Sequence, residues 1–135
     1  FSLIEEVKKR IKKKAEIIPY LRGYLAGEAY VGKRDREIQS ASKDINHLVF
    51  IKKLLEKINI RNSISKATST SPPRIIITNL NSFLILESVD IFKFHPEKKF
   101  NLIKKILNYK SLNQKISSKL KKKLFNLERS ISSKP

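Results

Sequence analysis

Two pairs of short strand-like segments constrain the fold of this 135-residue chain more than any other feature. The first pair is predicted at residues 29–32 and 37–42, and the second at residues 60–68 and 74–78. In the second pair, side chains alternate in polarity or β-branched residues follow one another, as is typical of strands. Two such pairs favour one four-stranded antiparallel sheet, covered by helices on one face and open to solvent on the other. The sequence therefore predicts an α+β domain.

Helices are expected before, between and after the strand pairs. The predicted helices cover residues 2–16, 19–28, 44–58, 79–89, 95–107 and 116–127. Pro19 is expected to end the first helix and to lie in the first turn of the second, because proline has no backbone N–H to donate. Asp44 is a suitable N-cap for the third.

The charge of the chain indicates its class of partner. Thirty Lys and Arg residues face twelve Asp and Glu residues, which gives a formal net charge of +18. Such an excess favours a polyanion as partner. No apolar run approaches the roughly 20 residues of a membrane-spanning helix. The basic stretches at residues 8–14 and 119–123 suit phosphate contacts or a solvated helix face, with a membrane surface as a further alternative.

Several kinds of site are excluded by residues that the sequence lacks. There is no Cys, so the chain has no disulfide, no Cys-based zinc site and no thiol nucleophile. His47 and His95 are too isolated to suggest a His-built metal site. Lys and Arg interrupt each short apolar run at the N-terminus, so no signal peptide is expected. An intracellular location is therefore predicted, in the cytoplasm, nucleoid or an organelle matrix.

One nine-residue segment carries a recognisable motif. Residues 21–29 read LRGYLAGEA and lie where a helix with small residues runs into the first predicted strand. This segment resembles the LAGLIDADG signature of the homing endonucleases. Direct matches are Leu21, Gly23 and Glu28, with an apolar Leu25 and a small Gly27. Ala26 replaces the first acid of the signature, and Ala29 replaces its final Gly.

The order of elements after the motif is similar to that family as well. A strand pair, a helix and a second strand pair precede a helix that starts with HPEKK at residues 95–99. The resemblance implies the αββαββα unit of the family, with a saddle-shaped four-stranded antiparallel sheet and helices on one face. It divides the chain into a basic N-terminal helix (1–16), an endonuclease-like domain (17–107) and a basic C-terminal helical extension (108–135).

The resemblance also implies an active site. In the family, the motif helices of two domains pack together, and the acid at the end of each helix holds divalent metal beside a scissile phosphate. Glu28 is then the catalytic and metal-binding acid, with Mg²⁺ as cofactor. One motif per chain requires a homodimer, or a second half outside this sequence, for cleavage of both strands; a symmetric dimer favours a palindromic or pseudo-palindromic target. The interface is expected at Leu21, Gly23, Tyr24 and Gly27.

Two lysines are further catalytic candidates by this resemblance. Lys93 lies near the place where the family has a lysine beside the active-site waters. A lysine there stabilises the attacking or leaving oxygen. Lys43, at the end of the second predicted strand, lies near another polar active-site position. Its neighbour Ser42 is an alternative, because the register is open by one residue.

The open face of the predicted sheet is the candidate DNA-reading surface. Arg and Gln can form paired hydrogen bonds with purine edges in the major groove, whereas contacts to phosphates give affinity without sequence preference. The candidate base-reading residues are Gln39, Arg61, Ser63 and Ser65. The candidate phosphate contacts are Lys33, Arg34, Arg36, Lys66 and Arg74.

Three functions are compatible with these features. The first is a site-specific homing endonuclease of the intron or intein type, which cuts double-stranded DNA as a homodimer. The second is a catalytically inactive relative that serves as a DNA-binding regulator or an RNA-binding maturase. The third is a basic structural protein that assembles on nucleic acid or the ribosome. The motif helix favours the first two, because a close contact between Gly- and Ala-lined helices has no use in a monomeric structural protein.

Overall fold

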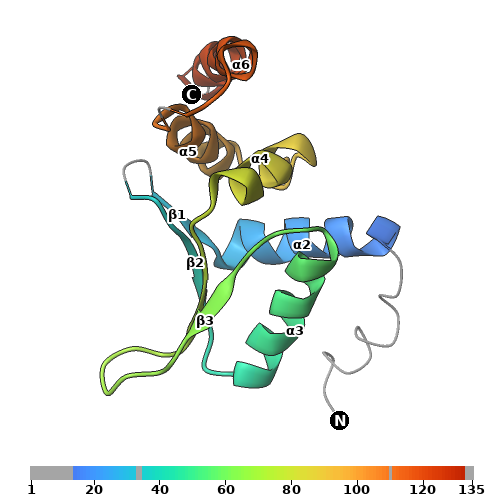
Figure 1. The fold of residues 1–135 in the computed structure, drawn as a ribbon, viewed down its shortest axis with the longest axis vertical. Helices are drawn as coiled ribbons and strands as arrows, with labels where there is room; N and C mark the ends of the chain where they lie inside the picture. The colour runs from blue at the N-terminus through green and yellow to red at the C-terminus, as the bar shows by residue number, and fades with distance from the viewer. Residues whose placement is uncertain (1–13, 33–34, 110, 133–135) are drawn as a thin grey trace.

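The computed structural model describes residues 14–32, 35–109 and 111–132. In chain order, the elements are α2 (Lys14–Glu28), β1 (Tyr30–Val31), β2 (Ile38–Ala41), α3 (Ile45–Lys57), β3 (Ser63–Ser65), β4 (Arg74–Ile77), α4 (Leu80–Ser88), α5 (Pro96–Leu107) and α6 (Gln114–Ser132). The predicted α+β fold is confirmed (Figure 1). None of the helices in the described ranges has the length and apolar character needed to cross a membrane.

The four strands form one antiparallel sheet in the order β1-β2-β4-β3. The two predicted strand pairs therefore join through β2 and β4 at the centre of the sheet. Helices α2 and α3 pack against each other and against the same side of these strands (Figure 1). No helix of the described residues covers the opposite face of the sheet, as the strand patterns predict.

The strand predicted over residues 60–68 is wrong in length, since β3 is only three residues long. Ile60 is 1% exposed, and its N–H donates to the Leu55 carbonyl of α3 at 2.9 Å. The next N–H, of Arg61, donates to Ser82 Oγ of α4 at 2.9 Å. Because both donors are engaged by helices, this segment cannot pair with β4 before Ser63.

The helix break predicted at Pro19 is also wrong, because α2 continues through this residue. Ile17, Leu21 and Leu25 lie four residues apart on one side of α2, and each is at most 2% exposed. Burial of such side chains contributes about 1.5–3 kcal/mol each, which together exceeds the roughly 3 kcal/mol cost of proline inside a helix. Of the helix predicted over residues 2–16, residues 2–13 lie outside the described residues.

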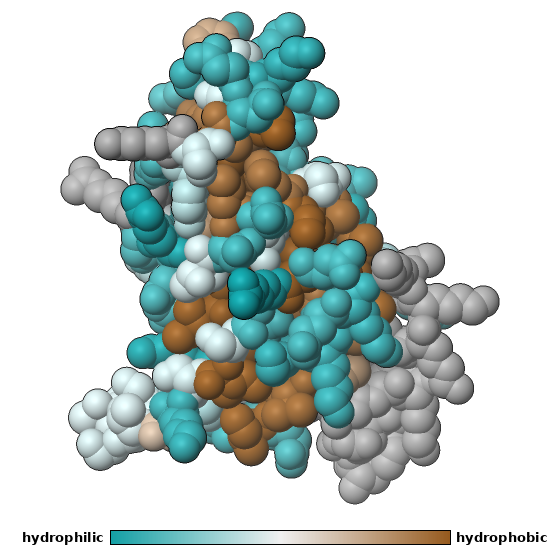
Figure 2. Space-filling view, in the orientation of Figure 1, coloured by the Kyte–Doolittle hydropathy of each residue, from teal (hydrophilic) through white to brown (hydrophobic). Residues whose placement is uncertain are grey.

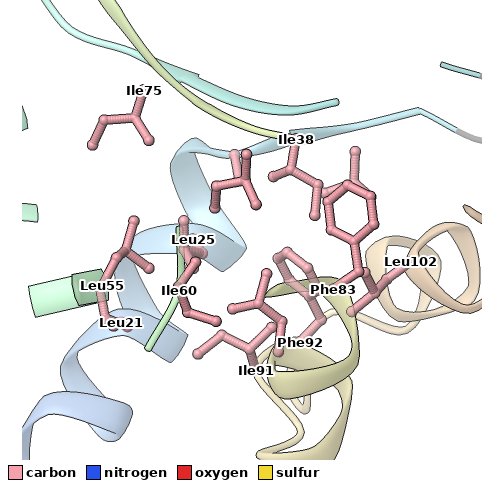
Figure 3. Packing of buried hydrophobic residues seen from close by; sticks show 14 of the residues in the cluster. Leu21, Leu25, Ile38, Leu55, Ile60, Ile75, Phe83, Ile91, Phe92 and Leu102 are labelled. Carbon is pink, nitrogen blue, oxygen red and sulfur yellow. The ribbon is translucent and has the colours of Figure 1, made fainter. Parts of the chain in front are cut away.

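The hydrophobic core lies between the sheet and the helices. Figure 3 shows Ile38 and Ile75 extending from the sheet toward side chains of the helices and their connections. The labelled core residues on that side are Leu21, Leu25, Leu55, Ile60, Phe83, Ile91, Phe92 and Leu102. Because one side of α2 is fixed in this core, its other side has a defined place at the surface.

A buried lysine ties the turn between β1 and β2 to α5. The Lys105 side chain is 1% exposed and its ammonium lies 2.6 Å from Asp35 Oδ1. The same ammonium also donates to the Asp35 backbone carbonyl. Nearby, Asn101 Nδ2 donates to the Val31 carbonyl at 2.9 Å. These contacts hold Asp35 and the end of β1 against α5.

Replacement of Asp35 by Ala is expected to lower the free energy of unfolding by about 2–3 kcal/mol. The loss comes from a buried ammonium that keeps only a carbonyl partner, and it stays below that of a fully buried pair because the Asp35 side chain is 43% exposed. Urea unfolding measures it. The matched control is Glu56→Ala, which breaks the exposed Lys52–Glu56 pair and should cost less than about 1 kcal/mol. Equal losses of unfolding free energy in both variants would contradict a stabilising role of the Lys105–Asp35 contact.

Candidate functional site

An open hollow of about 640 Å³ lies along the exposed side of α2. It is lined from α2 by Pro19, Tyr20, Gly23, Tyr24, Gly27 and Glu28, and from β2 and α3 by Ala41, Ser42 and His47. Three of the four residues that the motif predicts at an interface, and its acid, therefore share one surface. The structure places Leu21 elsewhere: it is 0% exposed in the chain's own core, which leaves no surface for a partner.

The two glycines of the hollow have no packing role within the described part of the chain. A Cβ built at Gly23 or Gly27 meets nothing within 4 Å. Neither residue has a positive φ, so the backbone does not require glycine. Each glycine inside a helix costs roughly 1 kcal/mol relative to Ala. Nothing among the described residues therefore requires a glycine at either position.

Two tyrosines of α2 line the hollow and contact β2 and α3. The hydroxyl of Tyr24 shares a hydrogen bond of 2.5 Å with Ser40 Oγ of β2. Burial raises the pKa of Tyr24, and the nearby Glu28 carboxylate adds to the increase, while the Ser40 bond opposes it. The Tyr24 ring also packs edge-on against His47, whose Nε2 lies 3.5 Å from the Tyr20 hydroxyl. These contacts hold α2 in one orientation relative to β2 and α3.

Glu28 is the last residue of α2 and is exposed. The chain turns from α2 into β1 at Ala29, which is 3% exposed and whose N–H donates to the Leu25 carbonyl at 3.0 Å. Ala29 is not among the residues with positive φ, so this turn does not need the glycine of the signature. The substitution at Ala29 therefore leaves the acid at the end of the helix, beside the sheet.

Lys98 is the functional candidate that sequence reasoning missed. Its ammonium donates to the Ala26 carbonyl, in the last turn of α2, at 2.6 Å. A cation at this end complements the negative end of the helix dipole. Burial lowers the pKa of Lys98, and the Glu28 carboxylate partly offsets this effect. Lys98 and Glu28 therefore form a cation and an anion at the same end of α2.

The two predicted lysines lie in different surroundings. Lys93 is exposed in the turn after α4, with its ammonium 5.8 Å from the centre of the Phe94 ring. Lys43 lines a separate hollow formed by residues 67–73. Of the two alternatives at the end of β2, Ser42 is the one that shares the hollow with Glu28. Both lysines stay predictions, and Lys98 joins them as a third candidate.

The sheet register places two rows of side chains on its outer face. The rows are Gln39, Ile76 and Ser63, and next to them Ala41, Arg74 and Ser65. Gln39 Nε2 donates to the Glu37 carboxylate. Nε of Arg74 is buried and has no hydrogen-bond partner among the described residues. The register nevertheless places the Arg74 side chain on the outer face, between Ala41 and Ser65.

The other candidate DNA contacts among the described residues are Arg61, Lys66 and Arg36. Arg61 and Lys66 are exposed on either side of β3. Arg36 lies with its guanidinium 5.3 Å from the centre of the Tyr109 ring, which holds it near the end of α5. Lys33 and Arg34 lie outside the described residues.

The divalent metal that the motif implies needs oxygen ligands, and Glu28 offers one exposed carboxylate. In the described ranges, no three or more His, Asp or Glu side chains gather to hold a metal ion. Mg²⁺, however, is usually bound by one or two carboxylates together with phosphate oxygens rather than by an all-protein cage. An exposed carboxylate at the negative end of a helix fits that donor set.

The family model of the LAGLIDADG-like domain matches residues 15–89, more than half of the chain. This chain belongs to the LAGLIDADG family. The matched region runs from α2 through α4 and so includes the hollow, Glu28 and the whole sheet. The family includes homing endonucleases and maturases, binds DNA, often dimerises and typically uses divalent metal. Among curated proteins and among solved structures there is no significant match.

Proposed function

We propose that this LAGLIDADG protein is a site-specific endonuclease that hydrolyses phosphodiester bonds of double-stranded DNA as a homodimer, with Mg²⁺ as cofactor. The observation that carries the proposal is the place of Glu28: an exposed carboxylate at the end of α2, at the border of the glycine-lined hollow. A second copy seated on that hollow by a two-fold axis brings a second Glu28 close to the first. One acid then serves each DNA strand.

Each chain contributes three groups to the cleavage in this proposal. Glu28 would hold Mg²⁺, and the ion would supply charge stabilisation and water activation. Lys98, held by the Ala26 carbonyl, stabilises negative charge that develops on phosphate oxygens. Tyr24 fixes α2 against β2 through Ser40, so that Glu28 keeps its place relative to the sheet.

The outer face of the sheet is proposed to contact the DNA duplex. Gln39 and Ser63 lie in one row of the register, and Ser65 lies beside Arg74 in the next row. Gln39 and Arg61 suit contacts to purine edges in the major groove. The basic residues Arg36, Lys66 and Arg74 suit phosphate contacts that orient the duplex.

A second candidate is a relative that binds DNA or RNA without cleaving it. It is favoured by the change of the first motif acid to Ala26, which leaves Glu28 as the motif's one carboxylate, with a lysine beside it. In this case the hollow and the sheet keep their roles in assembly and binding. Glu28 and Lys98 then satisfy each other's charge instead of serving a reaction.

Cleavage of a randomised duplex-DNA library, with and without Mg²⁺, distinguishes the two candidates. The endonuclease is expected to cut at one recurring site, only with Mg²⁺, and light scattering should give twice the 15.7 kDa mass of one chain. Salt-sensitive binding without cuts at any Mg²⁺ concentration would establish the non-cleaving relative instead. Cuts by a monomeric species would contradict the proposed two-fold arrangement.

A further inference from the structure

Helix α6 lies outside the region that matches the family model, at the end of the molecule beyond α5 (Figure 1). It packs on α5, and its Leu120 is 4% exposed. An ion pair of 2.7 Å between Lys123 and Glu87 joins it to α4. The apolar side of α6 therefore packs against α5, and the opposite side of the helix faces solvent.

The outward side of α6 is strongly basic. The helix carries one acid, Glu128, against six bases, Lys115, Lys119, Lys121, Lys122, Lys123 and Arg129. Four of these bases, at positions 115, 119, 122 and 129, are spaced three, four or seven residues apart and so lie on one stripe. All four are exposed. In Figure 2, the end of the molecule that α6 forms is mostly hydrophilic.

The stripe is not neutralised by the protein where the structure describes it. Among the described residues, Lys115, Lys119 and Lys122 form no ion pair. Arg129 lies with its guanidinium 5.8 Å from the centre of the Phe125 ring, which is itself 60% exposed. A row of unpaired like charges on a helix is unfavourable unless a polyanion compensates it.

We propose that this stripe on α6 binds the phosphate backbone of duplex DNA outside the sequence contacted by the sheet. The inference rests on the proposed function, in which the chain already binds a duplex. From residue 115 to residue 129 the stripe extends about 21 Å, which is the axial length of about six base pairs. An anionic membrane is a poorer fit, because the apolar side that would enter the lipid is packed on α5.

The test compares two double variants that each remove two exposed, unpaired lysines from one helix. Lys119→Gln with Lys122→Gln changes the stripe, and Lys53→Gln with Lys57→Gln changes α3 by the same charge. Binding to a 30-base-pair duplex of unrelated sequence is measured by fluorescence anisotropy over a series of salt concentrations. If both lysines contact phosphates, the slope of log K against log salt should fall by about 1.8 in the α6 variant. The α3 variant should keep the parent slope.

Equal slopes in all three proteins would overturn the inference, because the two α6 lysines would then contact no phosphate. Equal reductions in both variants would overturn it as well, because only the total charge would then matter. So would binding of phosphatidylserine vesicles that is lost in the α6 variant while its duplex slope is unchanged. Mg²⁺-dependent cleavage tests the proposed endonuclease activity separately. If the parent protein does not cut DNA but the α6 variant has the lower slope, this inference stands and the proposed endonuclease activity is wrong.

Discussion

Glu28→Gln is expected to lower the rate of Mg²⁺-dependent cleavage by about 10³-fold or more, since loss of a metal-binding carboxylate removes several kcal/mol of transition-state stabilisation. The affinity for the target duplex should change little. Gln has the same size and the position is exposed, so neither the fold nor the sheet face is disturbed. Single-turnover cleavage measures the rate, and anisotropy without metal measures the affinity.

The matched control for this variant is Glu56→Gln, which removes a carboxylate from an exposed site on α3. It should retain full cleavage, because Glu56 lies outside the hollow and the sheet face. Unchanged cleavage in Glu28→Gln would remove the acid from the mechanism. A parallel loss of cleavage and affinity would instead assign Glu28 to DNA binding or assembly.

Local signals in the sequence account for most of the helix starts. Asp44 accepts hydrogen bonds from the N–H groups of Asn46 and His47, as its position before an apolar stripe predicts. Asn79 and His95 likewise cap α4 and α5 through their side chains. Capping needs only neighbouring residues, so these starts could be predicted from sequence alone.

The two errors in the fold have a common physical cause. Pro19 and the segment from Ile60 to Asn62 have clear local preferences, the first against helix interior and the second for a strand. In both places, contacts with residues distant in sequence decide the outcome, through the buried side of α2 and the Ser82 hydroxyl. Such contacts are not visible in a local pattern.

Part of the candidate site was also accessible from the sequence. The motif predicts that Gly23, Gly27 and Glu28 share a surface, because these residue types suit close helix contact and metal binding. Lys98 was missed because its partner, the Ala26 carbonyl, is 72 residues away in the chain. A signal exists nevertheless: a lysine in the first turn of a helix opposes the helix dipole, so it needs a partner elsewhere.

Gly23→Leu is expected to have opposite effects on the chain and on its assembly. The isolated chain should become more stable by up to about 1 kcal/mol, because Leu has a much higher helix propensity than Gly and the built Cβ meets nothing within 4 Å. A homodimer that packs two such faces together should be weakened about 10²-fold or more. Overpacking costs about 1–3 kcal/mol at each of the two symmetry-related positions.

Sedimentation equilibrium measures the dissociation constant of the dimer, and urea unfolding at low protein concentration measures the stability of the isolated chain. Asn81→Leu, at an exposed position of α4 outside the hollow, is the control that adds the same side chain without touching the face. Double-strand cleavage should fall with the dimer fraction in Gly23→Leu and recover at high protein concentration. If the variant is more stable but dimerises like the parent, the glycines have no role in dimerisation. The two helix-destabilising glycines of α2 would then have no explanation among the described residues, since none of these packs against them.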